Sequence, residues 1–307
     1  MARKDQKQYV WINGEFIAFE DAKVHILTHS LQYGSGIFEG IRCYSTAKGP
    51  SVFRLKDHVR RFEESAKIYA MKLGYSAEEL TRAIEDLVRK NSLDSCYIRP
   101  FAFFDDAGIG LGVAGKKVSV AIAALPFGSY FKDKDRGIRC KVSSWRRISS
   151  EVLPPRAKAS GNYLNSIIAS SEAKEAGADE AILLSDRGYV AEGPGENIFL
   201  VKNGRLITPS EDADILLGIT RDSIIKLAEQ IGIEVEERNL HREELYTADE
   251  LFFSGTAAEI TPIVSVDGTK IGAGGKGPIT KVLDTEYSKA VIGEREGFES
   301  WCHYVGR

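Results

Sequence analysis

The alternation of apolar and polar residues over the first 125 positions predicts a mixture of strands and helices. Asn13-Gly14 separates two apolar runs, which is typical of a tight β-hairpin. Apolar residues at helical spacing predict a helix over residues 55–69. A second helix is predicted over residues 76–91, because Ser76 and Glu79 have the spacing of a capping box. Three segments combine β-branched and aromatic or apolar residues as strands do: 37–44, 97–104 and 118–125.

The pattern changes after residue 125. Residues 126–137 are polar and contain glycine, so we expect a linker between a small domain (1–125) and a larger one (138–307). Strands are predicted near 138–145, 180–185, 198–201, 234 and 250–254, and helices over 164–176, 220–231 and 278–292. Strands and helices mix without a regular βαβ repeat, which favours an α+β fold.

Composition narrows the class of protein. The chain has 307 residues, with 41 basic and 44 acidic side chains, so its overall charge favours neither nucleic-acid nor membrane binding. No apolar run reaches the roughly 18 residues of a membrane helix, and the charged first residues do not resemble a secretory signal. We therefore expect a cytoplasmic protein. Its four scattered cysteines are interpreted as reduced thiols.

The first segment that suggests chemistry is 156–163, Arg-Ala-Lys-Ala-Ser-Gly-Asn-Tyr. A lysine that attacks an aldehyde must be neutral, which favours a partly desolvated, electropositive pocket. The small residues after Lys158 would let a flat ring approach the backbone, and Tyr163 could direct its phenol at that ring. Taken alone, the segment is equally compatible with a surface lysine in a loop.

Three further segments offer groups for a charged ligand. Residues 191–197 place two carboxylates, Glu192 and Glu196, in a turn rich in glycine and proline, and either could sit beside a cationic ring nitrogen. Residues 218–222 open a predicted helix with Thr220 as its N-cap, where exposed amides can bind a phosphate. Residues 254–259 follow a strand with small side chains and a hydroxyl. Each segment alone is also compatible with ordinary turns and caps.

In combination and in this order, the four segments resemble the fold-type IV pyridoxal-phosphate enzymes, the branched-chain aminotransferase family in particular. The likeness covers nearly the whole chain and includes four more motifs: Leu31-Gln-Tyr33-Gly, Phe38-Glu-Gly40-Ile-Arg42-Cys-Tyr, His58-Val-Arg-Arg61 and Tyr97-Ile-Arg99-Pro100. The resemblance implies an α+β fold whose larger domain is built round a β-barrel-like core. It implies ping-pong transamination of leucine, isoleucine and valine with 2-oxoglutarate, and pyridoxal 5'-phosphate as cofactor.

The resemblance also implies roles for the residues that bind the cofactor. Lys158 matches the lysine that holds it covalently and moves the substrate proton. Tyr163 matches the partner of its phenolic oxygen, and Glu192 the partner of its ring nitrogen, which leaves Glu196 as a structural residue. The residues that match the phosphate site are Arg61, Ile219, Thr220 and Thr256.

Substrate residues follow from the same resemblance. An aromatic pocket for the side chain is matched by Tyr33, Phe38, Tyr130 and Tyr163, with Gly40 and Arg42 in the motif that separates this subgroup from D-amino acid aminotransferases. Arg42 is expected to support the site without touching substrate. Tyr97 and the amides of Thr256 and Ala257 match the α-carboxylate site, and Arg99 matches the arginine for glutamate's distal carboxylate. The Tyr33 segment and the loop 108–112 imply a homodimer or a larger assembly of dimers.

Two alternatives stay open. One keeps the fold and cofactor but changes the reaction, to a D-amino acid or (R)-amine transaminase or an aminodeoxychorismate lyase. The other is a catalytically silent protein that uses the cofactor structurally or not at all. Two weaker patterns are set aside: residues 272–277 fit GxGxxG outside any βαβ unit, and His25 and His29 lack a third metal ligand, so no metal is predicted.

Overall fold

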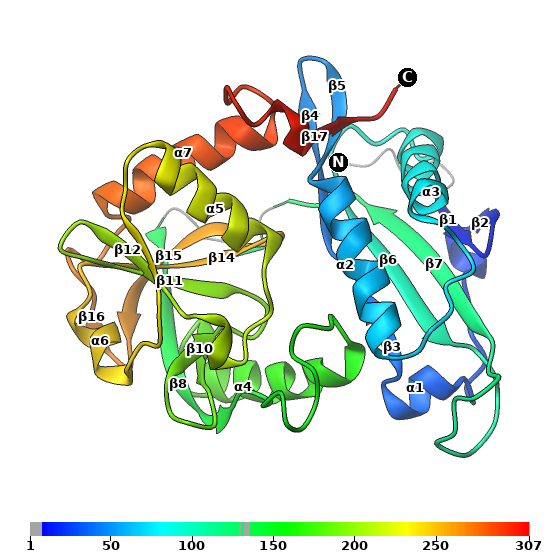
Figure 1. Cartoon of the computed structure of the whole chain (residues 1–307), viewed down its shortest axis with the longest axis horizontal. Coiled ribbons are helices and arrows are strands. Elements are labelled where there is room, and N and C mark those ends of the chain that lie inside the picture. Colours follow the sequence, from blue (N-terminus) through cyan, green and yellow to red (C-terminus); the bar gives the residue numbers. More distant parts are fainter. Residues whose placement is uncertain (1–7, 129, 132–135, 307) are drawn as a thin grey trace. The chain divides into compact units, whose positions relative to one another are not determined.

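The computed structural model describes residues 8–128, 130–131 and 136–306 (Figure 1). The chain divides into two compact units. Unit 1 contains the described residues up to Gly128, the segment Ala157–Gly161 and the described residues from Ala290 onward. Unit 2 contains the remaining described residues up to Lys289. Of the predicted linker 126–137, residues 129 and 132–135 lie outside the described part of the chain.

Unit 1 is built on an eight-stranded sheet with the strand order β17-β5-β4-β6-β7-β1-β2, and β3 pairs with β6. Its strands are β1 (Tyr9–Ile12), β2 (Glu15–Ala18), β3 (Gly36–Phe38), β4 (Ile41–Thr46), β5 (Gly49–Phe53), β6 (Cys96–Phe104), β7 (Val118–Leu125) and β17 (Cys302–Tyr304). Its helices are α1 (His29–Tyr33), α2 (Leu55–Ile68) and α3 (Ala77–Lys90). The predicted hairpin is confirmed, because Asn13 and Gly14 join β1 to β2 with positive φ angles of 49° and 96°.

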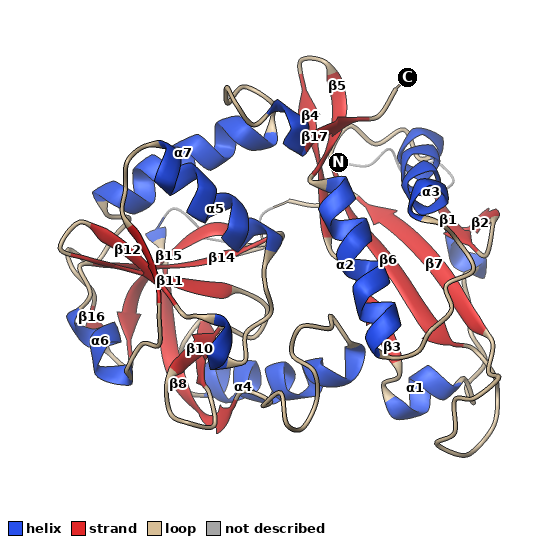
Figure 2. Cartoon of the chain, in the orientation of Figure 1, coloured by secondary structure: helices blue, strands red, loops and turns tan. Residues whose placement is uncertain are grey.

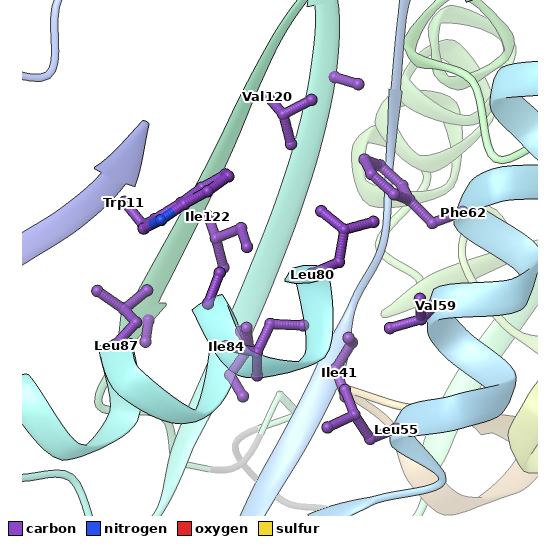
Figure 3. Close-up of a cluster of buried hydrophobic side chains, with 14 of the residues drawn as sticks. Trp11, Ile41, Leu55, Val59, Phe62, Leu80, Ile84, Leu87, Val120 and Ile122 are labelled. Atoms are coloured by element: carbon purple, nitrogen blue, oxygen red, sulfur yellow. The ribbon is translucent and has the colours of Figure 1, made fainter. Parts of the chain in front are cut away.

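Helices α2 and α3 pack apolar side chains onto this sheet. Figure 3 shows Val59 and Phe62 of α2 and Leu80 and Ile84 of α3 pointing into one cluster with side chains of the strands. The predicted capping box of α3 is confirmed: Glu79 N–H donates to the Ser76 hydroxyl over 3.2 Å, and Ser76 N–H donates to the Glu79 carboxylate over 2.8 Å. The apolar contacts fix α2 on the sheet, and another face of this helix carries site residues.

The strand predicted over residues 37–44 is in fact two strands, β3 and β4, which pair with β6 in one register. The interruption lies at Glu39 and Gly40. Glu39 N–H donates to the carbonyl of Pro100 over 2.9 Å, but proline has no N–H to return the bond. The ladder is therefore broken opposite Pro100, which periodicity within residues 37–44 could not reveal.

The segment 157–161 and the C-terminal residues were expected in the second domain, and the structure places both in unit 1. Ala159 forms a β-bridge with Ile37, the middle residue of β3. The strand β17 pairs antiparallel with β5. Both additions are backbone pairings with strands far away in the sequence, so local patterns carry no sign of them.

Unit 2 contains a nine-stranded sheet, seen as the barrel of red strands in Figure 2. Its strands are β8 (Ile138–Arg146), β9 (Glu180–Leu184), β10 (Val190–Glu192), β11 (Asn197–Lys202), β12 (Arg205–Thr208), β13 (Val235–Glu237), β14 (Glu250–Gly255), β15 (Glu259–Val266) and β16 (Thr269–Lys270). Six of them, in the order β10-β9-β8-β15-β14-β11, form a ring that closes where β11 pairs with β10. The expected α+β fold with a barrel-like core is confirmed.

The helices of this part of the chain are α4 (Tyr163–Glu175), α5 (Ile219–Gln230), α6 (Arg242–Thr247) and α7 (Pro278–Val291), whose last two residues belong to unit 1. The predicted cap of α5 is wrong: Gly218 is the N-cap and Thr220 is already helical. A side chain at Gly218 would overlap the amide oxygen of Asn197, so this position needs glycine. The glycine-rich segment 272–277 is a loop between β16 and α7.

All four cysteines are buried and free, as the sequence predicted. Cys43 and Cys96 lie directly opposite each other on β4 and β6. Contact with Cys43 and burial raise the pKa of the Cys96 thiol above its ordinary value. No helix in the part of the chain that the structure describes is long and apolar enough to cross a membrane.

Candidate active site

Lys158 lies beside the strand that carries Phe38. Its carbonyl accepts the Phe38 N–H over 2.9 Å, and its own N–H donates to the Ser65 hydroxyl of α2 over 3.2 Å. The Lys158 ammonium nitrogen lies 5.1 Å from the centre of the Phe38 ring. The lysine side chain is half-buried. Backbone bonds on both sides therefore hold this residue at a fixed place next to an aromatic ring.

Glu39, in the gap between β3 and β4, is fully buried. One carboxylate oxygen lies 2.6 Å from Nε of Arg61, and the other lies 2.9 Å from Nη2 of Arg61 and 2.7 Å from Nδ1 of His58. Burial raises the pKa of this carboxyl, but the charge of Arg61 and the contact with His58 outweigh it and hold the pKa well below its usual range. Glu39 is therefore a buried carboxylate anion with a bidentate arginine partner.

His58 is the neutral member of this group. Burial lowers its pKa below the ordinary value, against the attraction of Glu39, and the positive charges of Arg61 and Lys158 lower it further. Because a carboxylate only accepts hydrogen bonds, Nδ1 of His58 carries the hydrogen. One cation, Arg61, already balances the charge of Glu39, which removes the main reason for His58 to take a proton.

Tyr97 and Arg99 lie on β6, beside the interrupted strands. The Arg99 guanidinium carbon lies 4.5 Å above the Phe38 ring, and Nη2 donates to the Tyr97 hydroxyl over 3.3 Å. A Cβ atom at Gly40 would overlap the Tyr97 hydroxyl, so only glycine lets that phenol occupy its place. We call Phe38, Glu39, Gly40, His58, Arg61, Tyr97, Arg99 and Lys158 the Lys158 cluster, all of it in unit 1.

Glu192, in unit 2, is a buried carboxylate that forms an ion pair through one oxygen and accepts two hydrogen bonds through the other. One oxygen lies 2.7 Å from Nε of Arg147. The other accepts from the Asn197 side chain over 3.0 Å and from the Leu216 N–H over 3.1 Å. Its neighbour Glu196 instead accepts the Gly195 N–H within the turn over 3.0 Å. Two hydrogen-bond donors and the charge of Arg147, from three segments, thus orient the Glu192 carboxylate.

Asn197 joins the three motifs of unit 2 at one end of the barrel. Its side chain donates to both Glu192 and the Leu216 carbonyl, the latter over 2.9 Å, and abuts Gly218 at the start of α5. It also lies opposite Ser254 in the β11–β14 pairing. The turn with the half-buried Thr256 and Ala257 begins two residues later. We call Glu192, Asn197, the N-terminus of α5 and this turn the Glu192 cluster.

The donor set of the Glu192 cluster fits a ligand with a positive and a negative end. A buried carboxylate suits a cationic ring nitrogen, and the first amides of the 12-residue helix α5, Ile219 and Thr220, suit a phosphate. Gly218 lets the Asn197 side chain lie against the start of α5, since a Cβ atom at this position would overlap its amide oxygen. These residues match those that the resemblance of motifs assigned to pyridoxal phosphate.

Three predicted residues lie outside the contacts described so far. The Tyr33 ring on α1 lies 4.7 Å from the ring of His29, and its hydroxyl accepts the Gly110 N–H over 3.2 Å. Tyr130 is exposed and contacts the ring of Phe131 at 4.8 Å. Tyr163 is the first residue of α4 and is half-buried. The structure thus gives each of these residues a defined neighbourhood.

Sequence reasoning missed four polar residues of these clusters: Glu39, His58, Arg147 and Asn197. Glu39 and His58 belong to the motifs at residues 38–44 and 58–61. A carboxylate within an apolar run was the sign that Glu39 has a specific partner. Asn197 ended another quoted motif. Arg147 follows β8 directly and carried no signal, since only the fold brings it to Glu192.

The neutral state of His58 predicts how stability depends on pH. An unfolded histidine takes up a proton near pH 6.5, whereas buried His58 resists protonation, so the unfolded state binds more protons below that pH. The free energy of unfolding should therefore fall as the pH is lowered from 6.5 to 5.5 on account of this residue. Urea unfolding of the parent chain and His58→Gln at fixed protein concentration checks this. Parallel pH profiles would show that His58 is not the group responsible.

Comparison with known proteins shows the family to which the chain belongs. The sequence profile of the amino-transferase class IV family matches residues 36–266. The branched-chain-amino-acid aminotransferase of Escherichia coli (strain K12) is 49% identical over 302 residues, which cover 97% of this chain and 98% of that protein. Its counterpart in Pseudomonas aeruginosa is 45% identical over 303 residues and 98% of both chains.

Solved structures agree. The crystal structure of the Escherichia coli branched-chain amino acid aminotransferase matches with a TM-score of 0.95 and 48% identity, over 98% of this chain and 100% of that one. The T.th. branched-chain amino acid aminotransferase complexed with N-(5'-phosphopyridoxyl)-L-glutamate matches with a TM-score of 0.94 and 45% identity, over 98% and 99%. The resemblance predicted from the motifs is confirmed, and the chain belongs to the class IV aminotransferases.

Proposed function

We propose that this protein is a pyridoxal-phosphate-dependent aminotransferase that exchanges the amino group between branched-chain L-amino acids and 2-oxoglutarate in a ping-pong reaction. The names of full-length relatives support the branched-chain substrates. The ligand in the solved T.th. complex, a phosphopyridoxyl derivative of L-glutamate, supports both the cofactor and the second substrate. The observation that carries the proposal is the fixed place of Lys158 beside Phe38, with Arg99 over the same ring.

The residues that the motifs match would bind the cofactor. When bound, pyridoxal phosphate supplies an aldehyde carbon and a ring that withdraws electrons from it. Lys158 would bind that carbon, Glu192 would face the ring nitrogen, and Tyr163 would donate to the phenolic oxygen. The phosphate would be held by Arg61, the amides of Ile219 and Thr220, and the hydroxyl of Thr256. The two hydrogen bonds to Glu192 and its ion pair with Arg147 support this role, because they fix the position of the carboxylate.

Lys158 then has a second task. Its free amine would take the proton from the substrate Cα, hold it and give it back later in the reaction. The bonds that fix the backbone of Lys158 to Phe38 and Ser65 support this role, since a proton shuttle must stay within hydrogen-bond reach of both atoms.

Arg99 and Phe38 offer one site for two unlike side chains. The aromatic groups, Phe38 with Tyr33, Tyr130 and Tyr163, would accept an aliphatic side chain by apolar contact. Arg99 would bind the distal carboxylate of glutamate, and Tyr97 with the amides of Thr256 and Ala257 the α-carboxylate. With an aliphatic substrate the guanidinium keeps its stacking on Phe38, 4.5 Å away, so its charge is not left without a partner.

We further propose that the protein forms a homodimer through α1 and the loop 108–112. Leu31 is 58% exposed, Ile109 89% and Leu111 77%. The loop is tied to α1, because Gln32 donates to the Gly108 carbonyl over 3.0 Å. Water-exposed apolar groups on one ordered surface favour coverage by a second copy. The same surface carries Tyr33, which would then serve the neighbouring subunit.

Substitution of Lys158 by alanine should abolish the reaction. The variant lacks both the covalent attachment and the proton carrier, so turnover with L-leucine should fall by at least about 10³-fold. The absorbance spectrum of the bound cofactor should also differ from that of the parent protein, because the covalent attachment to the lysine is lost. Lys72→Ala, an exposed lysine in the same unit, is the matched control. Retained activity in Lys158→Ala would remove the lysine assignment.

A substrate panel tests the reaction itself. L-leucine, L-isoleucine and L-valine with 2-oxoglutarate should react much faster than D-alanine or (R)-phenylethylamine, because the clusters match the L-specific branched-chain subgroup. Initial rates by a coupled glutamate assay provide the comparison. Faster reaction of the D-amino acid or the (R)-amine would favour the alternative transaminases of this fold.

Arg99→Gln should separate the two half-reactions. Loss of a charge-assisted contact should raise KM for 2-oxoglutarate by roughly tenfold to a hundredfold, whereas the half-reaction with L-leucine changes much less. Single-turnover rates measured separately for the two substrates check this. Arg82→Gln, on the outer side of α3, is the control. Equal losses with both substrates would contradict the assignment of Arg99 to the distal carboxylate.

A further inference from the structure

Glu39 is the most deeply buried charge of the Lys158 cluster, and no cofactor or substrate role was assigned to it. Its carboxylate is fully shielded from water and is met by Arg61 and His58. Such a pair is not by itself a device for stability, because the cost of removing both charges from water largely cancels their attraction. A buried carboxylate in this place therefore calls for another explanation.

Contacts with the backbone hold Glu39 in place, and Glu39 in turn holds the side chain of Arg61. Glu39 is anchored through its backbone N–H to Pro100, and one of its carboxylate oxygens also accepts the Gly40 N–H over 3.2 Å. Arg61 projects from α2 on a long, flexible side chain. Two parallel N–H bonds, from Nε and Nη2, determine both the position and the plane of its guanidinium.

We propose that Glu39 is a positioning residue for Arg61, holding its guanidinium in the orientation that binds the phosphate of the cofactor. His58 supplies a further hydrogen bond that keeps the carboxylate in place. The inference rests on the proposed function, in which Arg61 contacts the phosphate. The edge of the guanidinium formed by Nε and Nη2 faces Glu39.

A glutamine at position 39 could not do the same work. It offers one acceptor and one NH2 group, and that NH2 group would face either a donor of Arg61 or the Nδ1–H of His58. The neutral state of His58 matters here as well, since a second cation would compete with Arg61 for the carboxylate. The arrangement therefore requires a carboxylate, one arginine and one neutral imidazole.

The test compares binding of pyridoxal 5'-phosphate and pyridoxal to the apo-protein, followed by absorbance. Both ligands carry the aldehyde and the ring, and only one carries the phosphate, so the Kd for pyridoxal divided by that for pyridoxal 5'-phosphate measures recognition of the phosphate. Glu39→Gln should reduce this ratio by roughly tenfold while leaving the affinity for pyridoxal unchanged. Arg61→Gln should reduce it at least as much, and the double variant no further than Arg61→Gln alone.

The controls separate positioning from general structure. Glu64→Gln removes one negative charge from the exposed face of the same helix and should leave the ratio unchanged. If Glu39→Gln does not fold, His58→Gln decides, with a smaller loss of the ratio expected and an unchanged ratio counting against the inference. Equal loss of affinity for both ligands in Glu39→Gln, or a loss that adds fully to that of Arg61→Gln, would overturn it.

Failure of the proposed function gives a different result. If Arg61→Gln alone leaves the ratio unchanged, then Arg61 does not bind the phosphate and the inference falls with that assignment. If Arg61→Gln lowers the ratio and Glu39→Gln does not, the assignment of Arg61 stands and only the role of Glu39 is overturned.

Discussion

One pair of residues closes the barrel of unit 2. Glu192 at the end of β10 lies opposite Asn197 at the start of β11, and this pairing completes the ring of six strands. Asn197 then uses its side chain to hold the Glu192 carboxylate and the segment that leads into α5. The same two residues thus close the fold and shape the candidate site. Closure leaves Glu192 little freedom, which suits the role proposed for it beside a ring nitrogen.

In unit 1, site residues are positioned by an interruption of the sheet between β3 and β4. Because Pro100 cannot donate a hydrogen bond, the strand opposite it breaks, and the two residues in the break are Glu39 and Gly40. Glu39 faces inward to Arg61, and Gly40 leaves room for the phenol of Tyr97. In a continuous strand, the side chains at positions 39 and 40 would have to point to opposite faces of the sheet. The site residues of unit 1 therefore depend on a missing backbone donor.

The sequence predicted those features whose physical causes are local. The capping box at Ser76 and the order of motifs around Lys158 needed no knowledge of distant contacts, and both the helix and the family were found. Features that depend on a distant partner were missed: the strand break depends on Pro100, the start of α5 depends on Asn197, and the role of Glu39 depends on α2. Motif matching names residues that touch a ligand, but it does not name the residues that hold them.

The pairing of β17 with β5 has a consequence for how the chain folds during synthesis. The sheet of unit 1 lacks one edge strand until residues 302–304 have been made, although its other strands are complete by residue 125. Throughout the synthesis of unit 2, β5 presents unsatisfied backbone groups along one side, a surface prone to wrong pairing. The last strand therefore acts as a cover on an exposed edge, and the nascent chain passes most of its time on the ribosome without it.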